Sequence, residues 1–346
     1  MTQLFPPMSP DFDPSTTVPL VIPPHDFGAW PATKHLFDED TVWAIRTALV
    51  TGRPLLLRGE PGIGKSQIAR AAAVALGVPF LAKVIDERTE RDDLLCYYDA
   101  VARVAAAQVC SLAKHQTDWK DIIDENRFLR PGVLWWAFNW KSAATQASRF
   151  CRTCREPESP TDTNGVRWTH ESHRLCGPVV LIDEIDKADP SVPNGLLECL
   201  GNEGFQSTHM PEAVSLPRND EGQVIRRPLV FITTNEEREL PPAFLRRCLV
   251  HSILFPKDPT PFLIQRARVF WPDGILSDGI LTKIVVQLMT DREAAQKDGL
   301  AMPGAAEFLD LARALAVRCP YNELTQGECL NAIAKFALKK NLPSSA

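Results

Sequence analysis

The feature that most constrains the fold is a glycine-rich stretch that joins an apolar run to an alanine-rich run. The apolar run at 55–57 predicts a buried strand, and the run at 66–76 predicts a helix that stops at Gly77. A strand, a glycine-rich turn and a helix in this order predict a phosphate-binding loop. The stretch fits the pattern G-x-x-x-x-G-K-[ST] without a mismatch and reads Gly59-Glu60-Pro61-Gly62-Ile63-Gly64-Lys65-Ser66.

Each residue type in this loop suits the binding of phosphate. Glycine permits positive φ and close approach, so successive backbone N–H groups can surround a phosphate. The amino end of the following helix adds its partial positive charge. Lys65 would reach the β- and γ-phosphates, and Ser66 would ligate Mg²⁺. The alternative, a glycine-rich turn that matches by chance, is disfavoured by the strand before it and the helix after it.

Two carboxylates follow a second apolar run, at 179–182. Ligands bind at the carboxyl ends of strands in a parallel sheet, which is where Asp183 and Glu184 would emerge. Asp183 would hold the Mg²⁺ shell through water, and Glu184 could orient and deprotonate an attacking water. The alternative is that the two acids only complement the dipole of the next helix.

A third apolar run, at 230–234, ends at Asn235. A short amide at a strand end could hydrogen-bond the attacking water or the γ-phosphate. The alternative is that Asn235 only forms a local turn.

The order of the apolar runs predicts the fold class. Short continuous strands at 79–85 and 249–255 join those above, and helices between strands indicate a parallel sheet buried on both faces. After Pro256 the pattern is helical. We predict an α/β P-loop fold with a small all-helical lid. The predicted parts are a proline-rich arm at 1–35, a nucleotide-binding domain at 36–256 with insertions at about 100–176 and 201–228, and a lid at 257–346 with helices at 260–271, 276–297, 304–318 and 326–339.

Composition excludes several classes of protein. In 346 residues, 45% are hydrophobic and 23% charged, which excludes wholesale disorder and a collagen-like fibre. The net charge of −5 argues against a chain-wide electrostatic hold on nucleic acid or acidic membrane. No apolar run is long enough to span a bilayer, and the amino terminus has no signal-peptide pattern. Nine cysteines without such a signal favour reduced thiols and a cytoplasmic location.

Taken together, these motifs resemble those of AAA+ ATPases, most closely the MoxR-like and dynein-related branch. The motifs are the loop, the run at 181–187, the strand that ends in Asn235, and the segment at 239–248. The resemblance implies ATP and Mg²⁺ as cofactors and a homo-oligomeric, hexameric ring. It also implies that Glu184 is the catalytic base and Asn235 the first sensor. It implies an arginine finger that acts in trans, with Arg247 as the first candidate and Arg246 close behind.

The resemblance has further consequences and one departure. It implies a hairpin at 201–228 and a protein client, which in MoxR-like systems often carries a von Willebrand factor A domain. The second sensor of the lid is normally a basic residue near the start of its third helix. The segment at 301–307 has none, so either Lys297 substitutes or the sensor is absent.

The insertion at 100–176 holds two features outside these motifs. Its aromatic residues, Trp135, Trp136, Phe138 and Trp140, form either a buried face or a partner-facing patch. Its second feature is a set of zinc-type ligands. The alternative is unliganded cysteines in a loop. The candidate zinc ligands are Cys151, Cys154, His173 and Cys176, with His170 in reserve.

Four functions compete. The leading one is an ATP-hydrolysing chaperone or motor that remodels or assembles a protein partner. The second is an ATP-gated oligomeric switch in a signalling or defence system. A DNA-acting motor is a weaker alternative, and a small-molecule kinase is disfavoured because it needs no catalytic Glu directly after the Asp. ATP is preferred over GTP, and the resemblance places the adenine contact near 35–37.

Overall fold

The computed structural model divides the chain into two compact units, which are described separately. The first unit contains Met1–Asp13, Asp40–Leu57 and Ala69–His251, and the second contains Pro14–Glu39, Arg58–Ile68 and Ser252–Ala346. The predicted domain boundary at 256 stays a prediction. The structure describes residues 12–24, 30–112, 122–149, 155–160, 168–169, 176–207, 210, 212–272 and 274–337.

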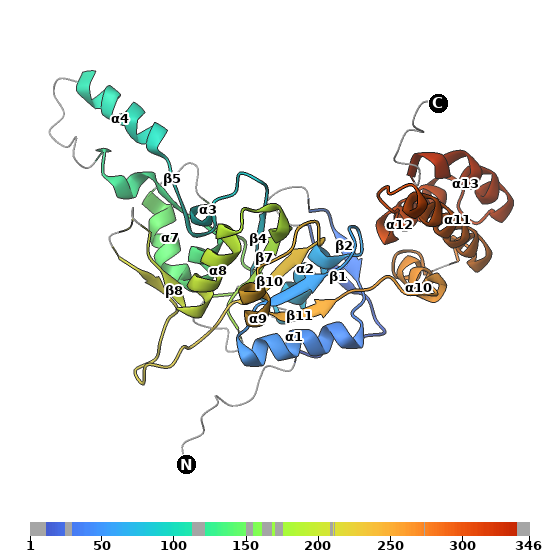
Figure 1. The fold of residues 1–346 in the computed structure, drawn as a ribbon, viewed down its shortest axis with the longest axis horizontal. Helices are drawn as coiled ribbons and strands as arrows, with labels where there is room; N and C mark the ends of the chain where they lie inside the picture. The colour runs from blue at the N-terminus through green and yellow to red at the C-terminus, as the bar shows by residue number, and fades with distance from the viewer. Residues whose placement is uncertain are drawn as a thin grey trace, which may run out of the picture. The chain divides into compact units, whose positions relative to one another are not determined.

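A five-stranded sheet forms the centre of the α/β part, in the strand order β11-β3-β10-β7-β4 (Figure 1). Strand β7 pairs in parallel with β10 and with β4. The four apolar residues of β7 are fully buried, which explains why this strand is a continuous apolar run rather than an alternating one. The predicted α/β fold is confirmed. The strands are β3 Leu55–Arg58, β4 Phe80–Val84, β7 Val179–Asp183, β10 Leu229–Thr234 and β11 Leu249–Ser252, and the accompanying helices are α1 Glu39–Thr51, α2 Lys65–Leu76, α8 Ser191–Gly201 and α9 Pro242–Arg247.

The first predicted insertion, together with the residues just before it from Arg91, has its own secondary structure and core. In this region β5 and β6 form an antiparallel pair, and helix α4 leads away from the sheet (Figure 1). Trp136 and Trp140 pack edge to face with ring centroids 5.1 Å apart, and Trp140 packs in the same way on Trp168. The aromatic residues are therefore a buried face and not a partner-facing patch. The elements are α3 Arg91–Leu95, β5 Cys96–Tyr98, α4 Ala100–Leu112, η1 Glu125–Phe128, β6 Leu129–Pro131, α6 Val133–Phe138 and α7 Trp140–Arg149.

The segment at 201–228, predicted as a hairpin insertion, contains short antiparallel pairings. Strand β8, Gly204–Phe205, pairs antiparallel with β9, Val214–Ser215. Beyond it, Arg218 and Val224 form an isolated antiparallel bridge. The turn between them is built on the Asn219 side chain, whose Oδ1 accepts from the backbone N–H groups of 221 and 223.

The second unit combines part of the proline-rich arm with the lid helices. Strand β1, Leu20–Ile22, pairs antiparallel with β2, Thr33–His35, so this part of the arm forms a small sheet. Phe255 packs against the lid core, which explains why β11 ends at Ser252 and not at 255 as predicted. The lid helices are α10 Thr260–Phe270, α11 Asp278–Lys297, α12 Ala305–Arg318 and α13 Glu323–Ala337.

The lid helices share one apolar core. Its centre consists of fully buried side chains from the first three helices, among them Leu263, Ile284 and Phe308. Leu330 adds the contribution of α13. Within the described residues, none of the helices combines the length and the apolar character that a bilayer crossing requires.

Candidate nucleotide site

The loop after β3 has the backbone of a phosphate cradle. The loop has three glycines with positive φ, a conformation that residues with a side chain rarely adopt: Gly59 at 151°, Gly62 at 76° and Gly64 at 104°. A Cβ on Gly59 would lie 2.5 Å from the backbone oxygen of Ile253, and one on Gly62 would lie 3.1 Å from the Cβ of Ala306. Glycine is therefore required at Gly59 by conformation and by space, and at Gly62 by conformation.

The predicted lysine of the loop is held against the loop itself. Lys65 is 7% exposed and begins α2. Its Nζ donates to the backbone oxygens of Gly59 at 2.6 Å and Glu60 at 2.9 Å. Ser66 follows in the first turn of α2, at the positive end of the helix dipole. A glycine cradle, a buried ammonium and a hydroxyl at a helix amino end fit the phosphates and the Mg²⁺ of a nucleotide.

The two carboxylate residues after β7 are organised by a hydroxyl of β10. Thr233 Oγ1 donates to Asp183 Oδ1 at 2.5 Å and accepts from the backbone N–H of Glu184 at 2.9 Å. Glu184 has φ 61° and ψ 48°, a left-handed conformation that is rare outside glycine. Such an observed outlier points to a functional turn, because the strain persists only where the surroundings impose it.

The Glu184 carboxylate contacts two polar side chains. Asn235 Nδ2 donates to Oε1 at 3.2 Å, and Lys187 Nζ donates to Oε2 at 2.7 Å. The hydrogen bond to Glu184 is also the main reason that the pKa of Lys187 is raised. The structure thus brings Glu184 and Asn235 together, as the strand-end argument predicts, and it adds Lys187. The roles of base and sensor stay predictions.

A buried acid fixes the backbone that follows Asn235. Asp186 is 2% exposed, and its Oδ2 accepts from the backbone N–H groups of Asn235 at 3.2 Å and Glu237 at 2.9 Å. No sequence pattern assigned Asp186 or Thr233 a role. The only available signal was polarity, since Asp186 follows the apolar strand β7 and Thr233 is a polar residue within β10.

The two candidate finger arginines end α9. Both Arg246 and Arg247 are exposed, as an arginine that acts on a neighbouring subunit would be. Arg53 donates from its guanidinium to the backbone oxygens of Arg246 at 2.5 Å, Arg247 at 3.2 Å and Cys248 at 2.9 Å. Arg53 therefore satisfies the carbonyls that the end of a helix leaves without partners.

Most of the candidate zinc ligands lie outside the described residues: Cys151, Cys154, His173 and the reserve His170. Cys176 is described and buried, and burial raises the pKa of its thiol to about 12. Across the described ranges, no group of three or more His, Cys, Asp or Glu side chains is placed to hold a metal ion. The zinc site stays a prediction.

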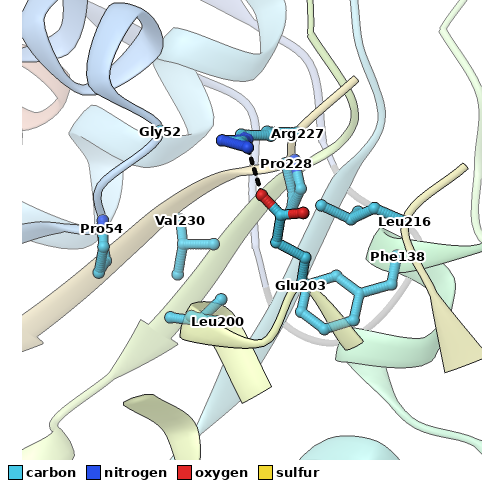
Figure 2. A pocket seen from close by; sticks show the side chains of 9 residues that line it. All are labelled: Gly52, Pro54, Phe138, Leu200, Glu203, Leu216, Arg227, Pro228 and Val230. Carbon is cyan, nitrogen blue, oxygen red and sulfur yellow. Dashed lines mark hydrogen bonds and ion pairs between the residues drawn. The ribbon is translucent and has the colours of Figure 1, made fainter. Parts of the chain in front are cut away.

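A small cavity lies elsewhere in the first unit (Figure 2). Pro54 precedes β3 and Val230 lies near the start of β10, so the cavity is at the amino ends of strands, away from Asp183 and Thr233. Glu203 pairs there with Arg227, which fills the space that a Cβ on Gly52 would need. These contacts hold the base of the hairpin. The other lining residues are Phe138, Leu200, Leu216 and Pro228.

Comparison with known proteins decides the family. The model of the AAA domain, dynein-related subfamily, matches residues 54–248, which is more than half of the chain. The chain belongs to the dynein-related subfamily of AAA domains. The enzyme class of this AAA protein is ATP hydrolase.

The other comparisons add little to this assignment. No curated protein matches the sequence. Among solved structures, a proposed ATPase from Cytophaga hutchinsonii ATCC 33406 is similar, with 13% identity, a TM-score of 0.34, and coverage of 86% of this chain and 80% of that one. The AAA match includes the phosphate loop, the Asp183-Glu184 pair, Asn235 and both finger candidates.

Proposed function

We propose that this AAA protein is a MoxR-like ATPase that forms a hexameric ring and remodels or assembles a protein partner. The observation that carries the proposal is the constrained turn at Glu184, whose carboxylate contacts Asn235 while Thr233 links it to Asp183. A catalytic base needs a fixed direction and a polar partner that can also contact its water. The left-handed backbone of Glu184 and its contact with Asn235 support this role.

The other site residues have separate proposed roles in binding and hydrolysing ATP. Residues 59–66 would surround the phosphates, and Ser66 and Asp183 would hold Mg²⁺. When bound, Mg²⁺ neutralises charge on the phosphates and polarises the bond to be broken. Glu184 would accept the proton of the attacking water, and Asn235 would position that water. On ATP binding, Lys65 would donate to phosphate oxygens in place of the backbone oxygens of Gly59 and Glu60.

We further propose that the adenine base contacts the end of the arm, near His35. His35 is 5% exposed, and its Nε2 is buried with no hydrogen-bond partner in the described part of the chain. Such a nitrogen could accept a hydrogen bond from the amino group of adenine.

The exposure of Arg246 and Arg247 supports action in trans, with Arg247 as the finger. The partner is proposed to be a protein, with a von Willebrand factor A domain as one form of it, because the net charge is −5. We place the protein in the cytoplasm.

A second candidate function is an ATP-gated switch, and one observation favours it. Lys187 forms an ion pair with Glu184 at 2.7 Å, and this pair occupies the proposed base. If this ion pair stayed intact when ATP binds, Glu184 could not act freely as a base. ATP would then drive assembly, and ATP turnover would stay slow.

The solution mass of Glu184→Gln protein, with and without Mg-ATP, tests the proposal. We expect a shift from monomer to a ring of about six chains, because the variant binds ATP and hydrolyses it slowly. Lys65→Ala should lose nucleotide binding and the shift. A variant that binds ATP and stays monomeric would contradict the ring. Wild-type ATP turnover in Glu184→Gln would contradict the assignment of Glu184 as the catalytic base. If the wild-type protein forms the ring with Mg-ATP but hydrolyses ATP only very slowly, the switch is favoured.

A further inference from the structure

A lid arginine is paired with the phosphate loop. Arg292 lies on α11, and its side chain is 9% exposed. Its Nη2 lies 2.9 Å from both carboxylate oxygens of Glu60, the second residue of the loop. Its Nη1 donates to the backbone oxygen of Pro303 at 2.6 Å, and its guanidinium lies over the ring of Phe255 at 4.2 Å. The buried Arg292 guanidinium is therefore held by a carboxylate, a backbone oxygen and an aromatic ring.

The contact continues from Glu60 to the lysine that would bind phosphate. The backbone oxygen of Glu60 accepts from Lys65 Nζ, so Arg292, Glu60 and Lys65 form one chain of contacts. All three residues belong to the second unit. A displacement of Glu60 would therefore move an oxygen that Lys65 contacts.

Two more lid residues contact the same loop. Arg266 on α10 donates from Nη1 to the backbone oxygen of Ile63 at 3.2 Å. Ala306, in the first turn of α12, lies close to the loop, because its Cβ would be 3.1 Å from a Cβ on Gly62. The loop and the lid are therefore in contact at several points, and the Glu60–Arg292 pair is a charged one.

We propose that Arg292 is a positioning residue that couples the phosphate loop to the helical lid through Glu60. The inference rests on the proposed binding of ATP at this loop. Separating lid from loop would leave a buried guanidinium without its carboxylate, which is costly. The lid position that keeps the pair is thus linked to the loop conformation that binds phosphate, and the linkage is reciprocal.

The proposed coupling gives the lid a basic residue near the phosphate loop, although the sequence has none at the usual position of the second sensor. The start of α12 has no basic residue, and Lys297 at the end of α11 is exposed. Arg292 lies five positions before it, on the same helix, where no motif marks it. The alternative is that Arg292 only stabilises the lid.

A double-mutant cycle separates the two roles. The variants are Glu60→Gln, Arg292→Gln and the double variant, with Arg292→Lys as the conservative change. The matched control is Arg268→Gln, because Arg268 is also a lid arginine with a carboxylate partner, Asp278, and with backbone acceptors inside the lid. The measurements are the Kd of a fluorescent Mg-ATP analogue, KM and kcat for ATP, and the melting temperature.

We expect each single Gln variant to raise the Kd for Mg-ATP by about tenfold, a typical size for coupling between sites. The double variant should raise it no further than the weaker-binding single variant, and Arg292→Lys should fall between wild type and Arg292→Gln. Arg268→Gln should lower the melting temperature without changing the Kd.

Additive effects of Glu60→Gln and Arg292→Gln would overturn the coupling, as would a wild-type Kd in Arg292→Gln. An equal rise of Kd in Arg268→Gln would show a structural role alone. If Arg292→Gln does not fold, Arg292→Lys and Glu60→Gln decide: wild-type Kd values in both overturn the proposal. Unchanged ATP binding in Lys65→Ala would instead contradict the proposed nucleotide site itself.

Discussion

The Thr233 hydroxyl lies between the two residues that carry the proposed chemistry. It donates to the Asp183 carboxylate and accepts from the Glu184 backbone, and the residue is fully buried. One hydroxyl thus orients the proposed Mg²⁺ ligand and fixes the turn that presents the proposed base. Threonine suits this place because its methyl group packs in the sheet while its oxygen reaches the turn.

Replacing Thr233 by Val should therefore impair both catalysis and folding. The change keeps the shape but leaves the Glu184 N–H without its acceptor, at a cost of roughly 1–3 kcal/mol in the free energy of unfolding. We expect kcat for ATP to fall by about tenfold, equivalent to about 1.4 kcal/mol in the barrier. Steady-state kinetics and urea unfolding measure the two effects. Thr233→Ser keeps the hydroxyl and is the control, and an unchanged kcat in Thr233→Val would contradict the assigned role.

His35 predicts a pH dependence of stability. Burial, and then the Arg266 guanidinium, lower its pKa from 6.5 to about 4, although Asp38 acts in the opposite direction. The unfolded chain therefore takes up the proton first as pH falls. The stabilisation from neutral His35 is complete above pH 6.5 and is lost as pH falls towards 4.

Urea unfolding of the whole chain at pH 7.5 and pH 5 measures this contribution. We expect the His35 share of the loss at pH 5 to be about 2 kcal/mol in the free energy of unfolding. His35→Leu cannot take up the proton, so its loss between the two pH values should be smaller by that amount. Equal losses in wild type and His35→Leu would contradict the buried neutral state.

At the scale of elements, α9 shows how a short helix is held in place. It has six residues, too few to be stable alone, and its terminal carbonyls accept from Arg53, which precedes β3. Phe244 anchors the helix in the core and is fully buried. The candidate fingers at its end are therefore exposed side chains on a fixed backbone.

Arg53→Ala should loosen the end of α9 without disturbing nucleotide binding. Loss of the charged donor leaves three backbone oxygens to water, at a cost of about 1–3 kcal/mol. We expect lower kcat with an unchanged Kd for Mg-ATP. Arg46→Ala, which removes an ion pair with exposed Asp13, is a control that should keep wild-type kcat. A raised Kd with normal kcat in Arg53→Ala would show that Arg53 acts on binding and not on α9.

At the scale of the whole molecule, action in trans predicts complementation between inactive variants. Arg247→Ala retains Glu184 and the loop, whereas Glu184→Gln retains Arg247. In a mixed ring, an Arg247→Ala subunit next to a Glu184→Gln subunit would have a complete site, so ATP turnover should reappear on mixing. Measured turnover across mixing ratios checks this, with Lys65→Ala/Arg247→Ala as the partner that should not complement. Mixtures no more active than their components would contradict the trans arrangement or the choice of Arg247.

The sequence alone predicted the α/β sheet, the glycine loop, the two acids after β7 and the amide after β10. These features depend on neighbours in the chain: a run of apolar residues, a helix that follows a turn, or a fixed spacing of glycines. The position of β11's end and the buried state of the tryptophans needed the packed core, because each depends on which distant element covers it.

Tertiary structure alone decided the contacts that tune these motifs. Thr233 lies 50 positions from Asp183, Arg53 lies 193 from Arg246, and Arg292 lies 232 from Glu60. No periodicity or spacing links such pairs, since each partner is an ordinary polar residue in its own segment. Folding makes them specific, because a buried charge or hydroxyl must find its partner where the chain brings one within hydrogen-bond distance.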